Sequence, residues 1–204
     1  MRKMSKYVAT SLWLGGAYFL TGWLGLLMPA VGTVVTLLWL PTGIAVAVLY
    51  RSGLRHWPAV AFASIAVNLF FEQSLTLAVG ISIGNTLGPM LAVQLLHRLR
   101  FDARLERNRD IAILAAAGHV GMTISAGGGV AVLFLSGLPR HEVFNTWLCW
   151  WAGDSMGVIA AAPLLLVASW SAFRSIRIRH REFAGWLPVS YTHLRAHETK
   201  ANLV

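Results

Sequence analysis

The stretch Trp147–Leu166 reads WLCWWAGDSMGVIAAAPLLL and contains one carboxylate, Asp154, among residues that are otherwise apolar or small. A run of this length and composition is typical of a helix that crosses a lipid bilayer. A charged side chain at the bilayer centre costs at least about 2.5–3.5 kcal/mol on insertion scales, so an acid there normally faces other helices or a water-filled cavity. The stretch therefore predicts a membrane helix whose acid points into a helical bundle.

The composition of the whole chain also indicates a membrane protein. Of the 204 residues, 56% are hydrophobic and only 12% are charged, and the mean hydropathy is +0.62. These values exclude an ordinary soluble domain of this length. The one cysteine, Cys149, rules out an intrachain disulfide and a CxxC metal or redox pair.

Apolar runs of membrane length recur along the chain. They are continuous and rich in Leu, Ala and Val, which favours helices over the short alternating strands of a membrane barrel. The first run follows a basic start like that of a signal peptide, but it is long enough to span the bilayer and is expected to stay uncleaved. We predict an all-α fold, a polytopic transmembrane helical bundle of about six spans, at residues 7–28, 33–50, 57–71, 74–96, 111–136 and 143–170.

Basic residues are concentrated in segments that would lie on one side of the membrane. They are Arg2, Lys3, Lys6, Arg51, Arg55, Arg98, Arg100, Arg104, Arg107, Arg109, Arg174, Arg177, Arg179 and Arg181, whereas the other side holds Arg140 with Glu72 and Glu142. Since positively charged loops stay in the cytoplasm, the N-terminus is expected to be cytoplasmic. The same loops explain the net charge of +9 without a nucleic-acid partner, and the expected partner is the lipid bilayer. The longest charged segment, residues 97–110, predicts a short surface helix.

Polar residues in the other runs are candidate partners for Asp154. Asn68, Asn85 and His119 lie in the third, fourth and fifth runs, and further candidates are Ser82, Ser125 and Ser155. Such contacts between membrane helices are worth about 0.6–2 kcal/mol and can serve structure alone. For Asp154 a ligand, proton or signalling role is preferred over the structural one, whereas for Asn68, Asn85 and His119 the structural interpretation is preferred.

Small residues and prolines predict close packing and distortion around Asp154. Gly153 and Gly157 form a small-xxx-small pair, and Gly80, Gly84 and Gly88 share one face of the fourth run, which predicts a tightly packed helix pair. Residues 127–129 are consecutive glycines and predict a bend or an unwound stretch. Pro41 and Pro163 predict kinks in the second and sixth runs.

The last residues, VSYTHLRAHETKANLV from Val189 to Val204, resemble a translated adapter from a DNA-sequencing library. We therefore expect residues 1–188 to be the native part, an integral-membrane domain that is itself truncated, and residues 189–204 to be an artefactual tail.

A long-read sequence of the genomic locus tests this expectation. The reading frame should continue past the codon for Pro188 into further native coding sequence. A native stop codon shortly after Pro188 would contradict it.

Several motifs together resemble the membrane-associated sensor 1 domain. They are WLPTG at 39–43, GNTL at 84–87, ISAGGGV at 124–130 and WWAGDSMG at 150–157 followed by Pro163. The resemblance implies a bacterial integral-membrane input domain of the kind found before histidine kinases, diguanylate cyclases and cyclic-di-GMP phosphodiesterases. It marks as motif positions Trp39, Pro41, Gly43, Asn68, Gly84, Asn85, Ser125, Ala126, Trp151, Gly153, Asp154, Gly157 and Pro163, which with His119 form the predicted sensing or packing core.

The function expected from these features is sensory input to a cytoplasmic C-terminal output domain, in a multi-pass protein of the bacterial inner membrane. Signalling proteins of this kind commonly act as dimers, so a homodimer is a further expectation. The alternative is a small transporter or ion-conducting bundle with a site at the membrane midplane, although no internal repeat supports it. No HExxH, GxSxG, GGDEF or paired carboxylate occurs, so we expect no catalytic site, metal or cofactor in this chain.

Overall fold

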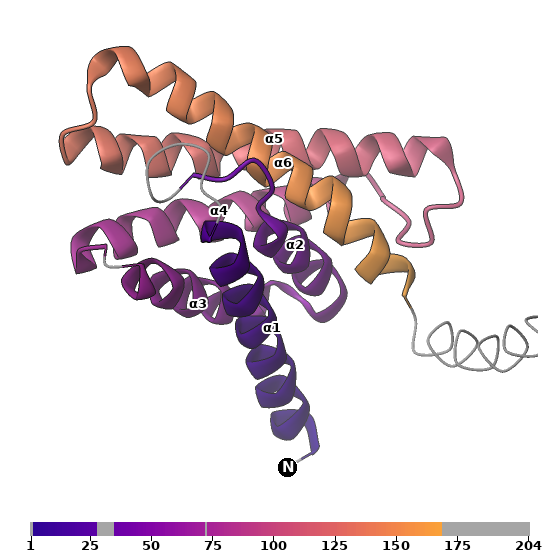
Figure 1. The fold of residues 1–204 in the computed structure, drawn as a ribbon. Coiled ribbons are helices and arrows are strands. Elements are labelled where there is room, and N and C mark those ends of the chain that lie inside the picture. Colours follow the sequence, from indigo (N-terminus) through magenta and orange to yellow (C-terminus); the bar gives the residue numbers. More distant parts are fainter. Residues whose placement is uncertain (1, 28–34, 72, 169–204) are drawn as a thin grey trace, which may run out of the picture. The chain divides into compact units, whose positions relative to one another are not determined.

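The computed structural model describes residues 2–27, 35–71 and 73–168, and every regular element in these ranges is a helix. The all-α prediction is confirmed. The elements are α1 (Arg2–Leu26), α2 (Leu40–Ser52), the 3-10 turn η1 (Leu54–His56), α3 (Trp57–Phe70), α4 (Leu75–Arg98), α5 (Asn108–Leu135), the 3-10 turn η2 (Arg140–Glu142) and α6 (Val143–Val167), shown in Figure 1. The predicted tail at 189–204 and the ends of the first, second and sixth predicted spans lie outside the described residues.

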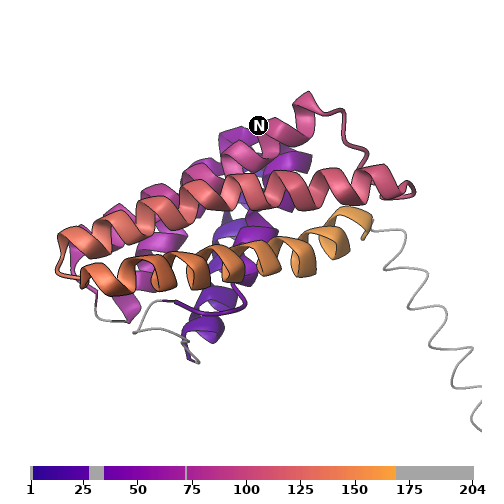
Figure 2. The ribbon, with the colours of Figure 1, turned by 90° about the horizontal axis from the view of Figure 1, so that it is seen from above.

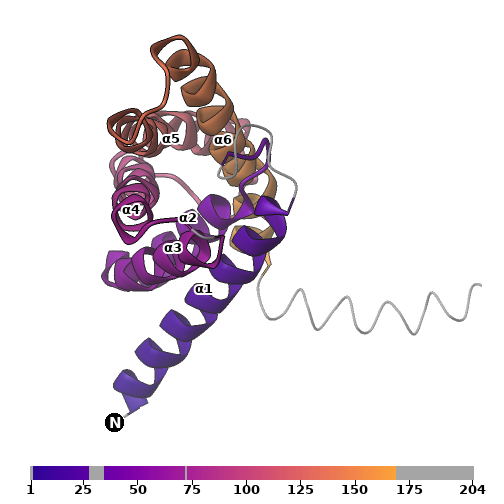
Figure 3. The ribbon, with the colours of Figure 1, turned by 60° about the vertical axis from the view of Figure 1, so that its left-hand side comes forward.

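Helix α2 lies inside an arc formed by α3, α4, α5 and α6, and α1 passes across α2 and α3 (Figures 1 and 3). In Figure 2, α5 and α6 extend in similar directions, and in Figure 1 α6 crosses α5 at an angle. Every residue from Pro41 to Leu49 is buried, as expected of a helix that is apolar all round and enclosed by neighbours. The bundle is therefore centred on a short helix, and the motif WLPTG forms its start.

In the part of the chain that the structure describes, three helical segments are long and apolar enough to cross a membrane: α4, α5 and Arg140–Val167, which joins η2 to α6. Helices α2 and α3 have 13 and 14 residues, or about 20 Å each at 1.5 Å per residue, less than the roughly 30 Å of hydrocarbon. Helix α1 has 25 residues, but Gly, Ser, Thr, Trp and Tyr lower its hydropathy. One helix occupies each of the six predicted runs.

The predicted start of the second helix and its kink at Pro41 are both wrong. The helix begins at Leu40 rather than at residue 33, and Pro41 lies in its first turn. Proline is favoured there because its missing N–H needs no partner and its φ is already helical. Just before the helix, the Trp39 backbone N–H donates to Gly153 O of α6 (2.9 Å). The Trp39 N–H thus bonds to another helix and not within an additional turn at the start of α2.

The glycines at 127–129 do not unwind the fifth helix, since α5 is helical throughout. They allow close packing instead: a Cβ on Gly128 would approach Gly84 of α4 at 3.3 Å, and one on Gly129 would collide with the Trp150 ring. The predicted pairing of the glycine face of α4 with another helix is confirmed, because Gly84 and Gly88 pack against Ser125 of α5.

The arginine-rich segment between α4 and α5 forms turns rather than the predicted surface helix. Arg100 and Leu105 adopt positive φ values of 52° and 56°, which interrupts helical geometry. The buried Asp110 fixes the loop by accepting a hydrogen bond from Asp102 N (3.1 Å). Hydrogen bonds from the Arg104 side chain lower the pKa of Asp102 to about 2, so Asp102 stays ionised at neutral pH.

Hydrogen bonds gather the described basic segments at one end of the bundle. Tyr7 Oη donates to Arg55 O (3.2 Å), and Tyr50 Oη donates to Phe101 O (2.7 Å). Arg51 Nη1 donates to Leu165 O (2.9 Å). The start of α1, the α2–α3 connection, the loop at 99–107 and the end of α6 therefore lie together, and η2 with Arg140 lies at the opposite end of α5 and α6.

The glycine contact between α2 and α6 gives a first test. A Cβ on Gly157 would collide with Trp39 O and lie 2.8 Å from Thr42 Oγ1. We expect Gly157→Ala to lower the free energy of unfolding by about 1–3 kcal/mol, the usual cost of overpacking. Unfolding with sodium dodecyl sulfate from mixed micelles measures this change.

Gly127→Ala is the matched control, because no atom lies within 4 Å of the added Cβ. Its stability should be unchanged or raised by up to about 1 kcal/mol. Equal losses in the two variants would show that close packing of α2 on α6 is not the cause.

Candidate functional site

Asp154 lies on α6, is 1% exposed and sits in the interior of the bundle. Ser125 Oγ of α5 lies 2.5 Å from its Oδ2. Its other oxygen, Oδ1, is buried and has no hydrogen-bond partner among the described residues. A buried polar atom without a partner is rare in native proteins. Oδ1 is therefore a candidate acceptor for a hydrogen bond from a bound molecule.

Ser125 connects Asp154 to α4. Its Oγ also lies 3.1 Å from Asn85 Oδ1, but a hydroxyl has one hydrogen to donate. When Asp154 is ionised, the Ser125 hydrogen serves the carboxylate. When Asp154 is protonated, the acid can donate to Ser125, and the hydroxyl is then free to donate to Asn85. The direction of these hydrogen bonds therefore depends on the charge of Asp154.

The network continues from α4 to α3. Asn85 Nδ2 donates to Ser64 Oγ (3.1 Å), and Asn68 Nδ2 donates to Ser64 O (2.8 Å). All three side chains are buried. The structure thus brings together four of the predicted residues, namely Asn68, Asn85, Ser125 and Asp154. Ser64 was missed, although it lies four residues before Asn68 and hence on the same face of the third run.

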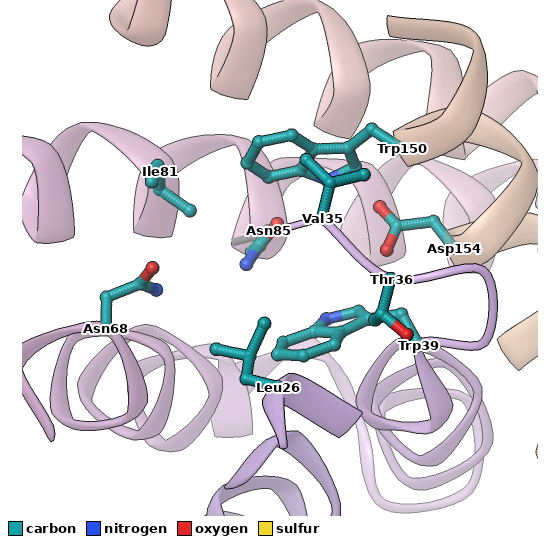
Figure 4. Close-up of a pocket in the computed structure, with 9 residues that line it drawn as sticks. All are labelled: Leu26, Val35, Thr36, Trp39, Asn68, Ile81, Asn85, Trp150 and Asp154. Atoms are coloured by element: carbon teal, nitrogen blue, oxygen red, sulfur yellow. The ribbon is translucent and has the colours of Figure 1, made fainter. Parts of the chain in front are cut away.

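A small cavity adjoins the carboxyl group, and Figure 4 shows its walls. The indole rings of Trp39 and Trp150 lie on opposite sides, with the Asp154 carboxyl group beside the space between them. The enclosed volume is about 10 Å³, at the lower limit for one water molecule. The lining residues are Leu26, Val35, Thr36, Trp39, Asn68, Ile81, Asn85, Trp150 and Asp154.

Trp39 Nε1 and Tyr18 Oη are further buried donors without a partner among the described residues. Trp39 lines the cavity, and the ring of Tyr18, on α1, meets Trp39 edge to face at 6.4 Å. Tyr18 is fully buried. Sequence reasoning missed Tyr18, and of the two adjacent tryptophans it marked Trp151 and not Trp150 as a motif position. Trp150 precedes Asp154 by four residues and so shares its helix face, whereas nothing in the sequence distinguishes Tyr18 from the other aromatic residues of the first run.

The motif WLPTG positions α6 directly. Thr42 Oγ1 donates to Trp39 O (2.7 Å) and lies 3.0 Å from Asp154 O. Gly43, Gly153 and Gly157 have no room for a side chain, since a Cβ on each would collide with a backbone carbonyl of the facing segment. These predicted glycines therefore bring the backbones of α2 and α6 together and hold Asp154 at the cavity.

His119, Trp151, Pro41 and Pro163 do not line the cavity. Trp151 Nε1 donates to His119 O (3.0 Å), the two rings lie 5.1 Å apart, and His119 Nδ1 lies 2.7 Å from Ala115 O. These contacts join α5 to α6 apart from the Asp154 network. Pro163 lies inside α6, two turns beyond Asp154.

The arrangement suits hydrogen bonding and charge recognition. Within the described residues, no three His, Cys, Asp or Glu side chains are grouped so that they could hold a metal ion. The cavity offers one carboxylate oxygen, two asparagine side chains and two indole rings.

The comparison with family models identifies a membrane-associated sensor domain. The MASE1 family model matches residues 10–190, and the chain belongs to this family. A MASE1 domain is sensory rather than catalytic, and the predicted resemblance is confirmed.

The chain is also similar to the probable diguanylate cyclase DgcE of Escherichia coli K12. The two are 27% identical over 141 residues, which cover 67% of this chain and 12% of the relative. The chain thus spans about an eighth of that protein and matches it through the sensor region. No solved structure matches the chain.

Proposed function

We propose that the chain is the membrane-embedded input domain of a bacterial signalling protein and that its stimulus acts on the packing around Asp154. The network of Asp154, Ser125, Asn85 and Ser64 carries this proposal, because it links α6, α5, α4 and α3 through buried side chains. A change in the charge or contacts of Asp154 alters which hydrogen bonds these helices share. A signal of this kind requires two packings of similar energy, which glycine-rich interfaces and a buried acid can supply.

The output domain is proposed to follow in the cytoplasm, after further spans that complete the sensory domain. A diguanylate cyclase is favoured by the name of the Escherichia coli relative, with a cyclic-di-GMP phosphodiesterase or a histidine kinase as the other classes. Residues 1–188 are proposed to be a truncated part of the native sensory domain, and residues 189–204 are proposed to be foreign to it. A second copy of the chain is the proposed partner within the bilayer.

A chimaera tests the signalling role of Asp154. Residues 1–188 replace the sensor region of the Escherichia coli relative, and cellular cyclic-di-GMP is measured. Asp154→Asn should change the output about fivefold or more, the lower range of typical coupling between sites, because the neutral amide fixes one hydrogen-bond pattern. Glu142→Gln is the matched control, since Glu142 lies in η2 at the opposite end from the output. Unchanged output in Asp154→Asn under every condition tried would refute the proposal.

We further propose six spans with a cytoplasmic N-terminus in the bacterial inner membrane. The basic loops gathered at one end of the bundle support this orientation, since the positive-inside rule assigns them to the cytoplasm. The short helices α2 and α3 would then cross with the help of the extended residues and turns that flank them.

Cysteine labelling tests the orientation. In a Cys149→Ser background, Ser136→Cys should react with a membrane-impermeant maleimide on intact spheroplasts. Ser52→Cys, at the basic end, should react only after the membrane is permeabilised. The reverse pattern would invert the proposed topology, and labelling of both positions on intact spheroplasts would refute an odd number of crossings between them.

A further inference from the structure

The cavity beside Asp154 has the features of a cation site. Asp154 Oδ1 is buried and without a partner, and it borders the space between the rings of Trp39 and Trp150 (Figure 4). Leu26, Val35 and Ile81 contribute apolar surface to the same space. An acceptor atom of a carboxyl group therefore faces a small volume that is otherwise largely aromatic and aliphatic.

An ionised Asp154 would need a positive charge from outside the described bundle. None of the residues that line the cavity is basic. The ion pairs found in the described ranges, Arg104 with Asp102 and His141 with Glu142, lie in loops at the ends of the helices. Burying an unpaired carboxylate is very costly, so either the acid is protonated or a cation occupies the cavity.

The walls of the cavity favour an ammonium group over a metal ion. Hard metal cations take six or more oxygen ligands, and the side chains that line the cavity offer fewer: one carboxyl group, the Thr36 hydroxyl and the amides of Asn68 and Asn85. The face of an indole ring attracts a cation electrostatically, with Trp the best of the aromatic residues. An N–H group can also donate a hydrogen bond to Asp154 Oδ1, whose lone pairs accept none from the described residues.

We propose that this cavity binds the ammonium ion. The ion donates to Asp154 Oδ1 and lies between the Trp39 and Trp150 rings. The volume of about 10 Å³ admits one non-hydrogen atom, which fits the ammonium nitrogen. The binding of the cation does not depend on the proposed signalling function. A role of the bound cation as the stimulus does depend on it.

Thermal unfolding of the 204-residue chain in lipid nanodiscs tests the binding. Ammonium chloride replaces sodium chloride at constant pH and ionic strength, with potassium and tetramethylammonium chlorides as comparisons. Because a ligand that binds only the folded state stabilises it, the melting temperature should rise and saturate with ammonium. It should not respond to potassium or tetramethylammonium.

Three variants locate the effect. Asp154→Asn should abolish the response to ammonium, and Glu142→Gln, which removes an exposed charge at the other end of α6, should keep it. Trp150→Phe retains an aromatic ring with a weaker attraction for cations and should weaken ammonium binding severalfold. If Asp154→Asn does not fold, an unchanged ammonium affinity in Trp150→Phe overturns the proposal.

The remaining outcomes also decide the question. Equal stabilisation by sodium, potassium and ammonium would overturn the choice of an ammonium group. Stability that depends on pH but not on the cation would assign the cavity to a protonated acid with a water molecule that accepts from Trp39 Nε1. Neither result would refute the proposed signalling function, because Asp154→Asn can alter the output without any cation. The chimaera experiment tests that function separately.

Discussion

The fold depends on how one buried carboxyl group is accommodated. The hydrocarbon of a bilayer supplies no hydrogen bonds, so Asp154 must find its partners within the protein. It does so through Ser125, Asn85 and Ser64, which draw α5, α4 and α3 around α6. The glycines of α4 and α5 allow the backbone approach that these short side chains require. Small residues and polar residues therefore work together, and the polar contacts would be lost if the helices stood further apart.

The second constraint is the contact between two motifs that are far apart in the sequence. WLPTG begins α2, and WWAGDSMG forms the middle of α6. Gly43, Gly153 and Gly157 let the two backbones meet, and Trp39 and Trp150 then close over the cavity from either side. The family's most recognisable residues thus build one region. This explains why a resemblance carried by separate short motifs corresponds to a single site in space.

Hydropathy and charge predicted the helical class and the placement of six helices, because these features repeat along each run. They did not predict where α2 begins. The sequence of residues 35–39 is as apolar as that of a membrane helix. The helix nevertheless begins only at Leu40, because the Trp39 N–H donates a hydrogen bond to Gly153 O, more than a hundred residues away. Asp154, Asn85, Asn68 and Ser125 could be predicted as a core because polar residues are conspicuous in apolar runs. Trp150 could not be separated from Trp151, since adjacent tryptophans differ only in the helix face that packing selects. Tyr18 became a candidate only when its buried hydroxyl was found without a partner.

Helices α2 and α6 run parallel and are joined at intervals along their length. Trp39 N bonds to Gly153 O, Thr42 Oγ1 lies 3.0 Å from Asp154 O, and Arg51 bonds to Leu165 O near the last turn of α6. Helix α2 is thus tied to the second half of α6, from Gly153 to Leu165. A displacement that begins at the carboxyl group would then be carried towards the end of α6 by two helices together and not by a lone helix.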